Sequence, residues 1–198
     1  MIIDLNTLLA WGAVYKKVGC GEVIFSEGSE CSYYNQLISG IVKWVNIDDN
    51  GKECIQTMIE PGECFGELPL FDDGLYAASA IAEEDVVLIR LRKNTFLQLI
   101  KENNEIHFAF TKLLAKRVRF KFLLLKSIAY HAPEVRITVL LGYLKKENKN
   151  FCANCNQLKL TRQQIADMTG LRVETVIRSM RNMHDKGEIV IERGKVFY

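Results

Sequence analysis

The chain contains no apolar run long enough to cross a membrane. Although 48% of its 198 residues are hydrophobic, charged residues interrupt each apolar stretch well before the roughly 18 residues that a membrane span requires. The first residues, MIIDLNTLLAWG, also lack the basic start that precedes the apolar part of a signal peptide. We therefore expect a cytoplasmic protein with no membrane partner.

Histidine is scarce, and none precedes His107; the other two are His131 and His184. A metal-dependent enzyme on a small β-barrel needs histidine and carboxylate ligands inside the barrel, and haem needs an axial ligand such as histidine. The first half of the chain offers no histidine for either purpose. We therefore predict no metal, no catalytic residues and no enzymatic activity.

The small net charge of +2 conceals an uneven distribution. Residues 1–105 contain 8 Lys and Arg against 17 Asp and Glu, a balance of −9, whereas residues 106–198 contain 18 against 7, a balance of +11. This asymmetry favours contact between the second half and a polyanion. Two solvated surfaces that merely differ in charge are the alternative.

Short β-prone runs fill the region from Gly21 to Leu91. The runs are GEVIF, YYNQLISG, IVKWVNI, CIQTMI and VVLIRL, and the turn signals between them are Gly28, Gly40, DDNG (48–51), PGE (61–63) and DDG (72–74). Strands at such regular spacing predict a small barrel or sandwich.

The apolar period changes over residues 94–129, which predicts one long helix. Apolar residues recur at helical steps, and more of them lie off that stripe than one packed face requires. One side of the helix can pack on the barrel, and the other side most simply packs on its own copy in a two-fold dimer. A helix buried inside a larger core is the alternative. A further amphipathic helix, EVRITVLLGYLKKE, follows Pro133.

A helix-turn-helix is predicted near the end of the chain. Thr161 with Gln164 three residues later is a capping-box pattern, so a helix begins directly after Thr161. Ala166 is small enough for a second helix to approach, and Gly170 supplies a left-handed turn. Val176, six residues further, is expected to fill the core between the two helices.

The second helix of this motif, from about Val173 to Lys186, is suited to reading bases. Glu174 and Arg178 lie four residues apart on its exposed face; Glu can accept from cytosine N4, and Arg can donate to guanine O6 and N7. An ordinary Glu–Arg pair on a solvated helix is the alternative. The full set of predicted DNA contacts is Thr161, Arg162, Arg172, Val173, Glu174, Thr175, Ile177, Arg178 and Lys195.

The last ten residues, IVIERGKVFY, predict a two-strand hairpin that turns at Arg193–Gly194. A hairpin in this place is the wing of a winged helix. Lys195 in this wing is expected to contact a DNA phosphate.

Two motifs together resemble the family of the cyclic-AMP receptor protein and the oxygen regulator FNR, the CRP/FNR family. PGECFGELPLFDDG (61–74) is similar to the effector-pocket segment of that family, and LTRQQIADMTGLRVETVIR (160–178) is similar to its DNA-binding helices. The resemblance implies an α+β fold with an N-terminal double-stranded β-helix, or jelly roll, like that of cyclic-nucleotide-binding domains. A long dimerisation helix and a C-terminal winged helix-turn-helix would follow it.

The resemblance also implies what the protein does. It predicts a homodimeric transcription regulator that binds promoter DNA at a two-fold site, with RNA polymerase as a further partner. The implied domains are a β-roll sensor over residues 1–105, a dimerisation helix over 106–130 and a DNA-binding domain over 131–198. An effector-binding regulatory module without DNA binding is the alternative.

The DNA-reading positions are closer to the FNR side of the family. Glu174 and Arg178 match the family residues that read the TGA core of a half-site. Val173 stands where the cyclic-AMP receptor has a guanine-contacting arginine, so we predict a half-site closer to TTGA than to GTGA. Ile177 stands where FNR has a serine, and its methyl groups could favour a thymine. Arg172 takes the capping position of the helix and is expected to contact phosphate instead.

The effector-pocket positions depart from those of cyclic-nucleotide binders. Ala77 and Ala78 replace an arginine that pairs with the cyclic phosphate and a small hydroxyl residue, while Lys121 and Phe122 replace the hydroxyl pair that contacts adenine. A buried phosphate without its cation is costly, so we do not expect cyclic AMP as the effector. An aromatic or apolar ligand is the first prediction, and a pocket filled by its own side chains is the alternative. The predicted pocket residues are Glu67, Leu68, Tyr76, Ala77, Ala78, Lys121 and Phe122.

The six cysteines are expected to be thiols in a cytoplasmic protein. Only Cys20 lies ahead of the roll, so the cysteine cluster of an iron–sulfur sensor is missing. Cys152 and Cys155 form a CxxC pair, which is a candidate redox pair or half of a zinc site. Ordinary thiols are the alternative, since isolated CxxC matches are frequent.

Overall fold

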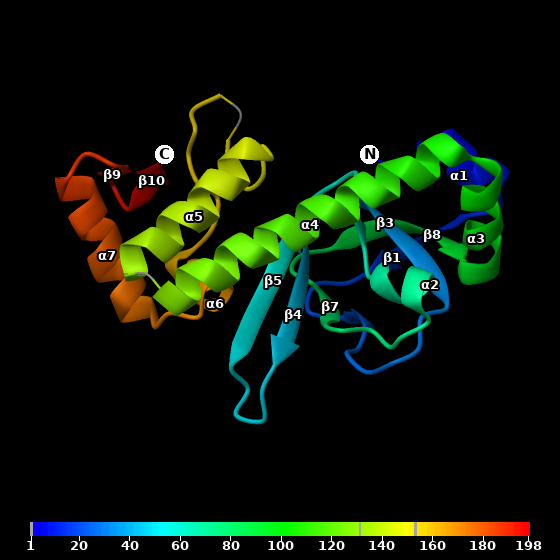
Figure 1. Ribbon diagram of the computed structural model, residues 1–198, viewed down its shortest axis with the longest axis horizontal. Coiled ribbons are helices and arrows are strands. Elements are labelled where there is room, and N and C mark those ends of the chain that lie inside the picture. The colour runs from blue at the N-terminus through cyan, green and yellow to red at the C-terminus, as the bar shows by residue number, and fades with distance from the viewer. Residues whose placement is uncertain (1, 131, 153) are drawn as a thin grey trace. The chain divides into compact units, whose positions relative to one another are not determined.

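The computed structural model describes residues 2–130, 132–152 and 154–198 (Figure 1). The chain divides into two compact units, Met1–Leu114 and Ala115–Tyr198, and His131 lies outside the described residues. Within the described ranges, no helix has both the length and the apolar character to cross a membrane.

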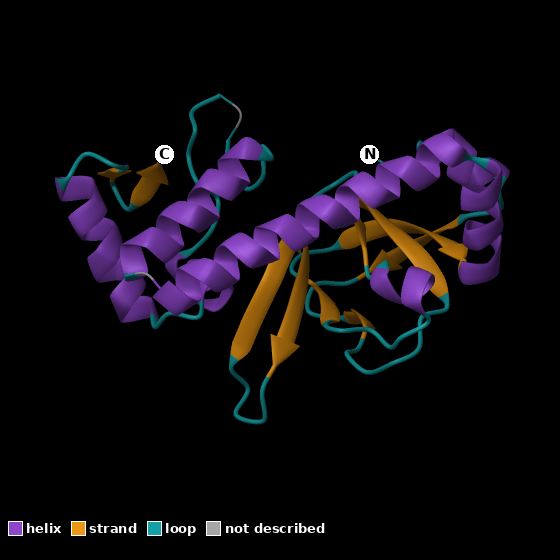
Figure 2. Ribbon diagram, in the orientation of Figure 1, coloured by secondary structure: helices purple, strands orange, loops and turns teal. Residues whose placement is uncertain are grey.

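The first unit is built around two four-stranded antiparallel sheets (Figure 2). Their strand orders are β1-β8-β3-β6 and β2-β7-β4-β5, which is the arrangement of a jelly roll. The strands are β1 Val14–Val18, β2 Val23–Phe25, β3 Tyr33–Ser39, β4 Val42–Ile47, β5 Glu53–Ile59, β6 Cys64–Phe65, β7 Ser79–Ala82 and β8 Val86–Arg92. The five expected strands are confirmed, and β1, β6 and β7 are additional.

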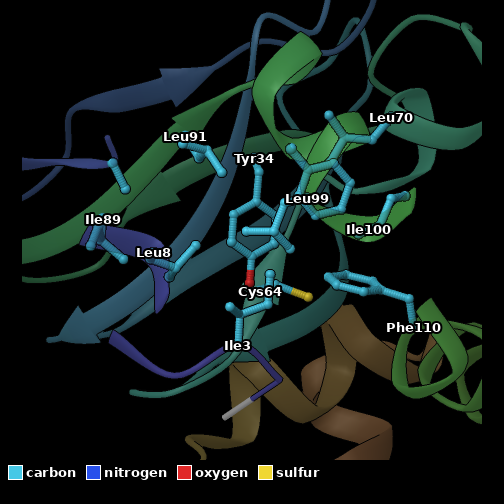
Figure 3. Packing of buried hydrophobic residues seen from close by; sticks show 12 residues of the cluster. Ile3, Leu8, Tyr34, Cys64, Leu70, Ile89, Leu91, Leu99, Ile100 and Phe110 are labelled. Atoms are coloured by element: carbon cyan, nitrogen blue, oxygen red, sulfur yellow. The ribbon is translucent and has the colours of Figure 1, made fainter. Parts of the chain in front are cut away.

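Side chains of β8 alternate between two hydrophobic clusters, one on each face of the strand. Leu88 packs into a cluster with Trp44 and Phe65. Ile89 and Leu91, on the opposite face, join Tyr34 and other side chains in a second cluster, shown in Figure 3. That cluster includes residues of α1 (Leu5–Ala10), α2 (Leu68–Asp72), α3 (Lys93–Glu102) and the beginning of α4 (Asn104–Tyr130).

The sequence predicted one helix over residues 94–129, but the structure has two helices there. The prediction of one continuous helix is therefore wrong. Helix α3 ends at Glu102 and α4 begins at Asn104. Between them Asn103 leaves the helical region, with φ −128° and ψ 86°, and its side-chain amide donates to the Leu99 carbonyl oxygen at 2.8 Å. The amide therefore satisfies a carbonyl left open at the end of a helix, as Asn side chains do locally. Apolar periodicity does not reveal a break of one residue.

The second unit is a winged helix that includes the C-terminal part of α4. Its other elements are α5 Pro133–Lys146, α6 Arg162–Thr169, α7 Val173–Asp185, β9 Val190–Glu192 and β10 Lys195–Phe197. Phe120 of α4 stacks on Tyr143 of α5 with ring centroids 3.7 Å apart. Buried residues of α5, α6 and α7 include Leu140, Ile165 and Met180, all fully enclosed. The α+β class and the winged helix predicted from the sequence are both confirmed.

Candidate DNA-binding surface and effector sites

The first helix of the helix-turn-helix begins with the predicted capping box. The Gln164 backbone N–H donates to Thr161 Oγ1 at 3.1 Å, and the Thr161 backbone N–H donates to Gln164 Oε1 at 2.9 Å. Gly170 ends α6 with φ +67°, in the left-handed region where glycine is favoured. Ala166 is buried, and its carbonyl oxygen accepts the N–H of Leu171. Local interactions therefore define both the start of α6 and the turn that follows it.

The second helix, α7, separates a core face from an exposed face. Val176 and Met180 are fully buried, as predicted. Glu174 and Arg178 are exposed one turn apart, and Ile177 beside them is 45% exposed. Val173 and Thr175 are only half-buried. These positions leave two charged groups and one branched apolar side chain for an external partner.

Glu174 and Arg178 form no ion pair with each other, although both lie within the described residues. An intrahelical pair at this spacing would contribute about 0.2–0.5 kcal/mol to an isolated helix. The alternative in which these residues merely stabilise a solvated helix therefore has no contact to support it. Both groups keep their hydrogen-bonding capacity for another molecule.

Basic residues lie at the start of both helices. Arg172 is the N-cap of α7, is exposed, and makes no side-chain capping bond. The open backbone N–H groups at a helix start favour an anion. Arg162 opens α6 and is half-buried; burial lowers its pKa, but an arginine retains its charge at neutral pH. Both guanidinium groups are suited to a phosphate.

The wing is the predicted hairpin. Strands β9 and β10 pair antiparallel, with Lys195 opposite Glu192. Arg193 (φ +48°) and Gly194 (φ +79°) form the turn, and two successive positive φ values are typical of a type I′ hairpin. Lys195 is exposed at the start of the returning strand. The turn therefore places a cation at the tip of the wing.

The predicted effector-pocket residues of the first unit lie around a filled interior. Glu67 is fully buried, Tyr76 and Ala78 are nearly so, and Leu68 and Ala77 are exposed. Tyr76 also has a raised pKa, because burial and the neighbouring Cys31 outweigh the hydrogen bond from Asn35.

Aromatic rings occupy the space behind this segment. Phe25 stacks on Tyr76 with ring centroids 3.8 Å apart, and Phe65 lies 5.9 Å from Phe25. A Cβ at Gly66 would lie 2.5 Å from the Phe25 ring, so only glycine fits there. Aromatic side chains therefore pack against this segment, and both the predicted effector pocket and the alternative of a pocket filled by its own side chains stay predictions.

Lys121 and Phe122, the other two predicted pocket residues, belong to the second unit. Phe122 is 68% exposed on α4, and Lys121 next to it is also exposed. Their participation in one pocket with Tyr76 stays a prediction.

The CxxC pair lies in a turn that is hydrogen-bonded to the wing. The Cys152 N–H donates to the Gln157 carbonyl oxygen at 2.8 Å, and Gln157 bridges to Phe197 of β10. A hydrogen bond from Cys155, with backbone donors at Asn154 and Cys155, lowers the pKa of the Cys152 thiol. Among the described residues, no group of three or more His, Cys, Asp or Glu could hold a metal ion.

Sequence reasoning missed a basic cleft of about 200 Å³ in the first unit. Lys16, Arg90 and Tyr33 line this cleft together with residues of β2 and the loop before β3. The alternation Leu88-Arg90-Arg92 on β8 was the available signal, since it places two arginines on the same face as a core leucine. The partner strands, which only the fold specifies, complete the cleft.

A jelly roll and a winged helix-turn-helix in one chain define a DNA-binding transcription regulator. Residues 15–103 match the cyclic nucleotide-binding domain family, and residues 135–197 match the Crp-like helix-turn-helix domain family. The cAMP-activated global transcriptional regulator CRP of Pasteurella multocida is 32% identical over 171 residues, which cover 85% of this chain and 80% of that protein. The chain belongs to the CRP/FNR family of transcription regulators, which are not enzymes.

Further similarities agree with this assignment. The cyclic AMP receptor protein of Thermus thermophilus is 27% identical over 176 residues, covering 89% of this chain and 79% of that protein. The structure of the c-di-GMP-responsive global regulator CLP of Xanthomonas campestris has a TM-score of 0.76 at 20% identity, covers 98% of both chains and shows the shared fold. The predicted family is confirmed, and the alternative of a module without DNA binding is disfavoured.

Proposed function

We propose that the protein is a homodimer that reads a palindromic TTGA-like promoter site through α7 and changes its DNA affinity in response to a small molecule or a redox signal. The observation that carries the proposal is the exposed, unpaired arrangement of Glu174 and Arg178 opposite the buried Val176 and Met180. The helix is fixed by its core face, so its two charged groups are presented rigidly to the major groove.

The base preference follows from donor and acceptor chemistry. Arg178 would hold guanine O6 and N7 of the TGA core, and Glu174 would accept from the N4 amino group of a cytosine. The branched side chain of Ile177, exposed beside them, supports a thymine methyl contact at the outer position. Val173 has no polar group with which to select a guanine there, which favours TTGA over GTGA.

Backbone contacts would orient the helix on the duplex. Arg172 and Arg162 carry cations to the starts of α7 and α6, while Thr161 and Thr175 offer hydroxyl groups and Lys195 reaches from the wing. Phosphate contacts of this kind set position without selecting a sequence. The division into a sensor (1–105), a dimerisation helix (106–130) and a DNA-binding domain (131–198) belongs to the same proposal, as does RNA polymerase as the partner at the promoter.

An exposed apolar stripe on α4 supports the dimer. Val118, Phe122 and Leu125 are 54%, 68% and 62% exposed. With the exposed Ala115 and Ala129 they follow alternating three- and four-residue steps, the spacing of a coiled-coil seam. A two-fold axis would place this stripe against itself in a second copy.

The residues at the predicted effector pocket do not suit cyclic AMP. The two relatives above are named for cyclic AMP, but here Ala77 and Ala78 offer no cation for its phosphate, and the rings of Phe25 and Tyr76 fill the adjoining space. Cyclic AMP is therefore disfavoured as the effector. The Cys152–Cys155 pair, hydrogen-bonded to the wing through Gln157, is the candidate for a redox signal.

Fluorescence anisotropy tests the proposal. The duplexes carry two inverted TTGA half-sites about one helical turn apart, the same design with GTGA, or a scrambled site, each with reduced and with oxidised protein. We expect tightest binding to TTGA. Equal affinity for all three duplexes would contradict the base-reading assignment, and equal affinity of the reduced and oxidised protein would remove the redox signal.

A further inference from the structure

The two cations of the basic cleft in the first unit lie on strands that are neighbours in one sheet. Arg90 of β8 is paired with Val14 of β1 on one side and with Asn35 of β3 on the other. Lys16 lies two residues beyond Val14 and therefore on the same face, next to Arg90. The cleft of about 200 Å³ is lined by Lys16, Ile24, Phe25, Glu30, Ser32, Tyr33, Asn35, Tyr76 and Arg90.

The charges in this cleft are not balanced by the protein. Lys16 and Arg90 form no ion pair with any described residue, and the one carboxylate in the lining, Glu30, is exposed to solvent. The Nε atom of Arg90 is buried and has no hydrogen-bond acceptor in the described chain. A buried charged donor without an acceptor is costly, so an anionic ligand would be favoured here.

Flat surfaces surround these cations. The Arg90 guanidinium lies 4.5 Å from the centre of the Tyr33 ring, and Phe25 and Tyr76 stack nearly parallel, at 9°. Burial raises the pKa of Tyr76, so its hydroxyl stays protonated and adds no negative charge. Stacked rings favour a planar ligand, and a guanidinium binds a carboxylate through two parallel hydrogen bonds.

We propose that this cleft binds a small aromatic carboxylate, whose carboxylate meets Arg90 and Lys16 and whose ring packs on the aromatic side chains. The cleft is smaller than the roughly 300–1,000 Å³ of pockets for drug-sized ligands, so a ligand with one ring is favoured. The role of this ligand as an effector rests on the proposed regulatory function, whereas its binding to the cleft does not.

Isothermal titration calorimetry on the full-length protein without DNA tests the binding. The probes are benzoate, salicylate and phenylacetate, with benzyl alcohol as the neutral analogue. We expect at least one acid to bind and benzyl alcohol not to bind. Arg90→Met should weaken that acid about ten- to a hundredfold, because it removes charge-assisted hydrogen bonds, and Arg90→Lys should weaken it less.

Lys16 and its neighbour Lys17 provide a test variant and a matched control. Lys16→Met removes the second cation of the cleft and should weaken the acid several-fold. Lys17→Met removes the next charge along β1, which points to the opposite face and is exposed, and should leave affinity unchanged. Lys16 is only partly buried at the cleft, so its variant keeps the test valid if Arg90→Met unfolds.

Three results would overturn the proposal. They are no binding of any of the three acids, equal binding of benzyl alcohol, and wild-type affinity in both Lys16→Met and Arg90→Met. Anisotropy on the TTGA duplex with and without the bound acid is measured separately. Failure of DNA binding there would contradict the proposed function and leave the calorimetric result intact.

Discussion

Trp44 donates its indole N–H to the carbonyl oxygen of Ala78 across 3.3 Å. Ala78 lies in the segment predicted to form the effector pocket, and Trp44 is 8% exposed in the core cluster that also contains Phe65. The indole thus packs beneath the predicted pocket and is tied to its backbone. This contact links the predicted pocket segment to the core of the roll.

Removal of the Trp44 ring should be costly. We expect Trp44→Ala to lower the free energy of unfolding by about 3–5 kcal/mol, because a large buried ring leaves a cavity, and Trp44→Phe to cost less. Urea unfolding followed by circular dichroism measures both. Cyclic AMP should not raise the midpoint of wild-type unfolding, and a rise would contradict the view that this segment is filled.

Base-reading and backbone contacts should respond differently to mutation. Arg178→Ala should cost about 1–3 kcal/mol of binding free energy on the TTGA duplex and reduce the preference over a scrambled duplex. Lys195→Ala should weaken both duplexes equally and reduce the salt slope of log K by about one. Anisotropy titrations at several salt concentrations measure these effects. An equal loss of affinity for both duplexes in Arg178→Ala would indicate that Arg178 contacts phosphate instead of a base.

Phe122 should matter for dimer formation. It is 68% exposed in the apolar stripe on α4, more than Val118 or Leu125, so Phe122→Glu would place an unpaired charge in the seam and raise the dimer dissociation constant roughly tenfold or more. Phe122→Leu keeps the position apolar and should leave the dimer intact. Sedimentation equilibrium measures both variants. A Phe122→Glu dimer as tight as the wild type would place the interface elsewhere.

Alanine substitutions at two glycines distinguish the cost of backbone strain from the cost of a steric clash. A Cβ at Gly170 would meet nothing within 4 Å, so Gly170→Ala carries only the penalty of φ +67°, about 1–2 kcal/mol. A Cβ at Gly40 would lie 2.6 Å from the Asp85 carbonyl oxygen, in addition to φ +85°, so Gly40→Ala should cost more. Thermal unfolding compares the two. Gly170→Asn should recover part of the loss, since Asn tolerates this region.

The lowered pKa of Cys152 predicts its reactivity. Its hydrogen bond from Cys155 stabilises the thiolate, so the thiolate persists at lower pH, and iodoacetamide should modify Cys152 with a pH midpoint below the usual thiol value of about 8.5. Cys155→Ala should raise this midpoint, because it removes the thiol donor, and Cys155→Ser should raise it less, because the serine hydroxyl can still donate. Peptide mass spectrometry follows the modification. A midpoint insensitive to position 155 would contradict this cause.

The helix-turn-helix could be predicted from the sequence because its determinants are local. The capping box of Thr161 and Gln164, the left-handed Gly170 and the Arg193–Gly194 turn each act within a few residues. Such short-range preferences depend only on residues that are close together in the sequence, so they can be recognised without the tertiary structure. The strands between Gly21 and Leu91 were predictable for a similar reason, since turn residues separate them.

Tertiary structure alone decided the rest. Lys16 and Arg90 are more than seventy positions apart in the sequence, and only the pairing of β1 with β8 places them in one cleft. The contacts at the predicted pocket segment likewise join distant residues, since Phe25 stacks on Tyr76 and Trp44 donates to Ala78, which no local pattern specifies. Sequence periodicity indicates which face of an element is apolar, whereas strand register and packing determine which residues from distant segments meet on that face.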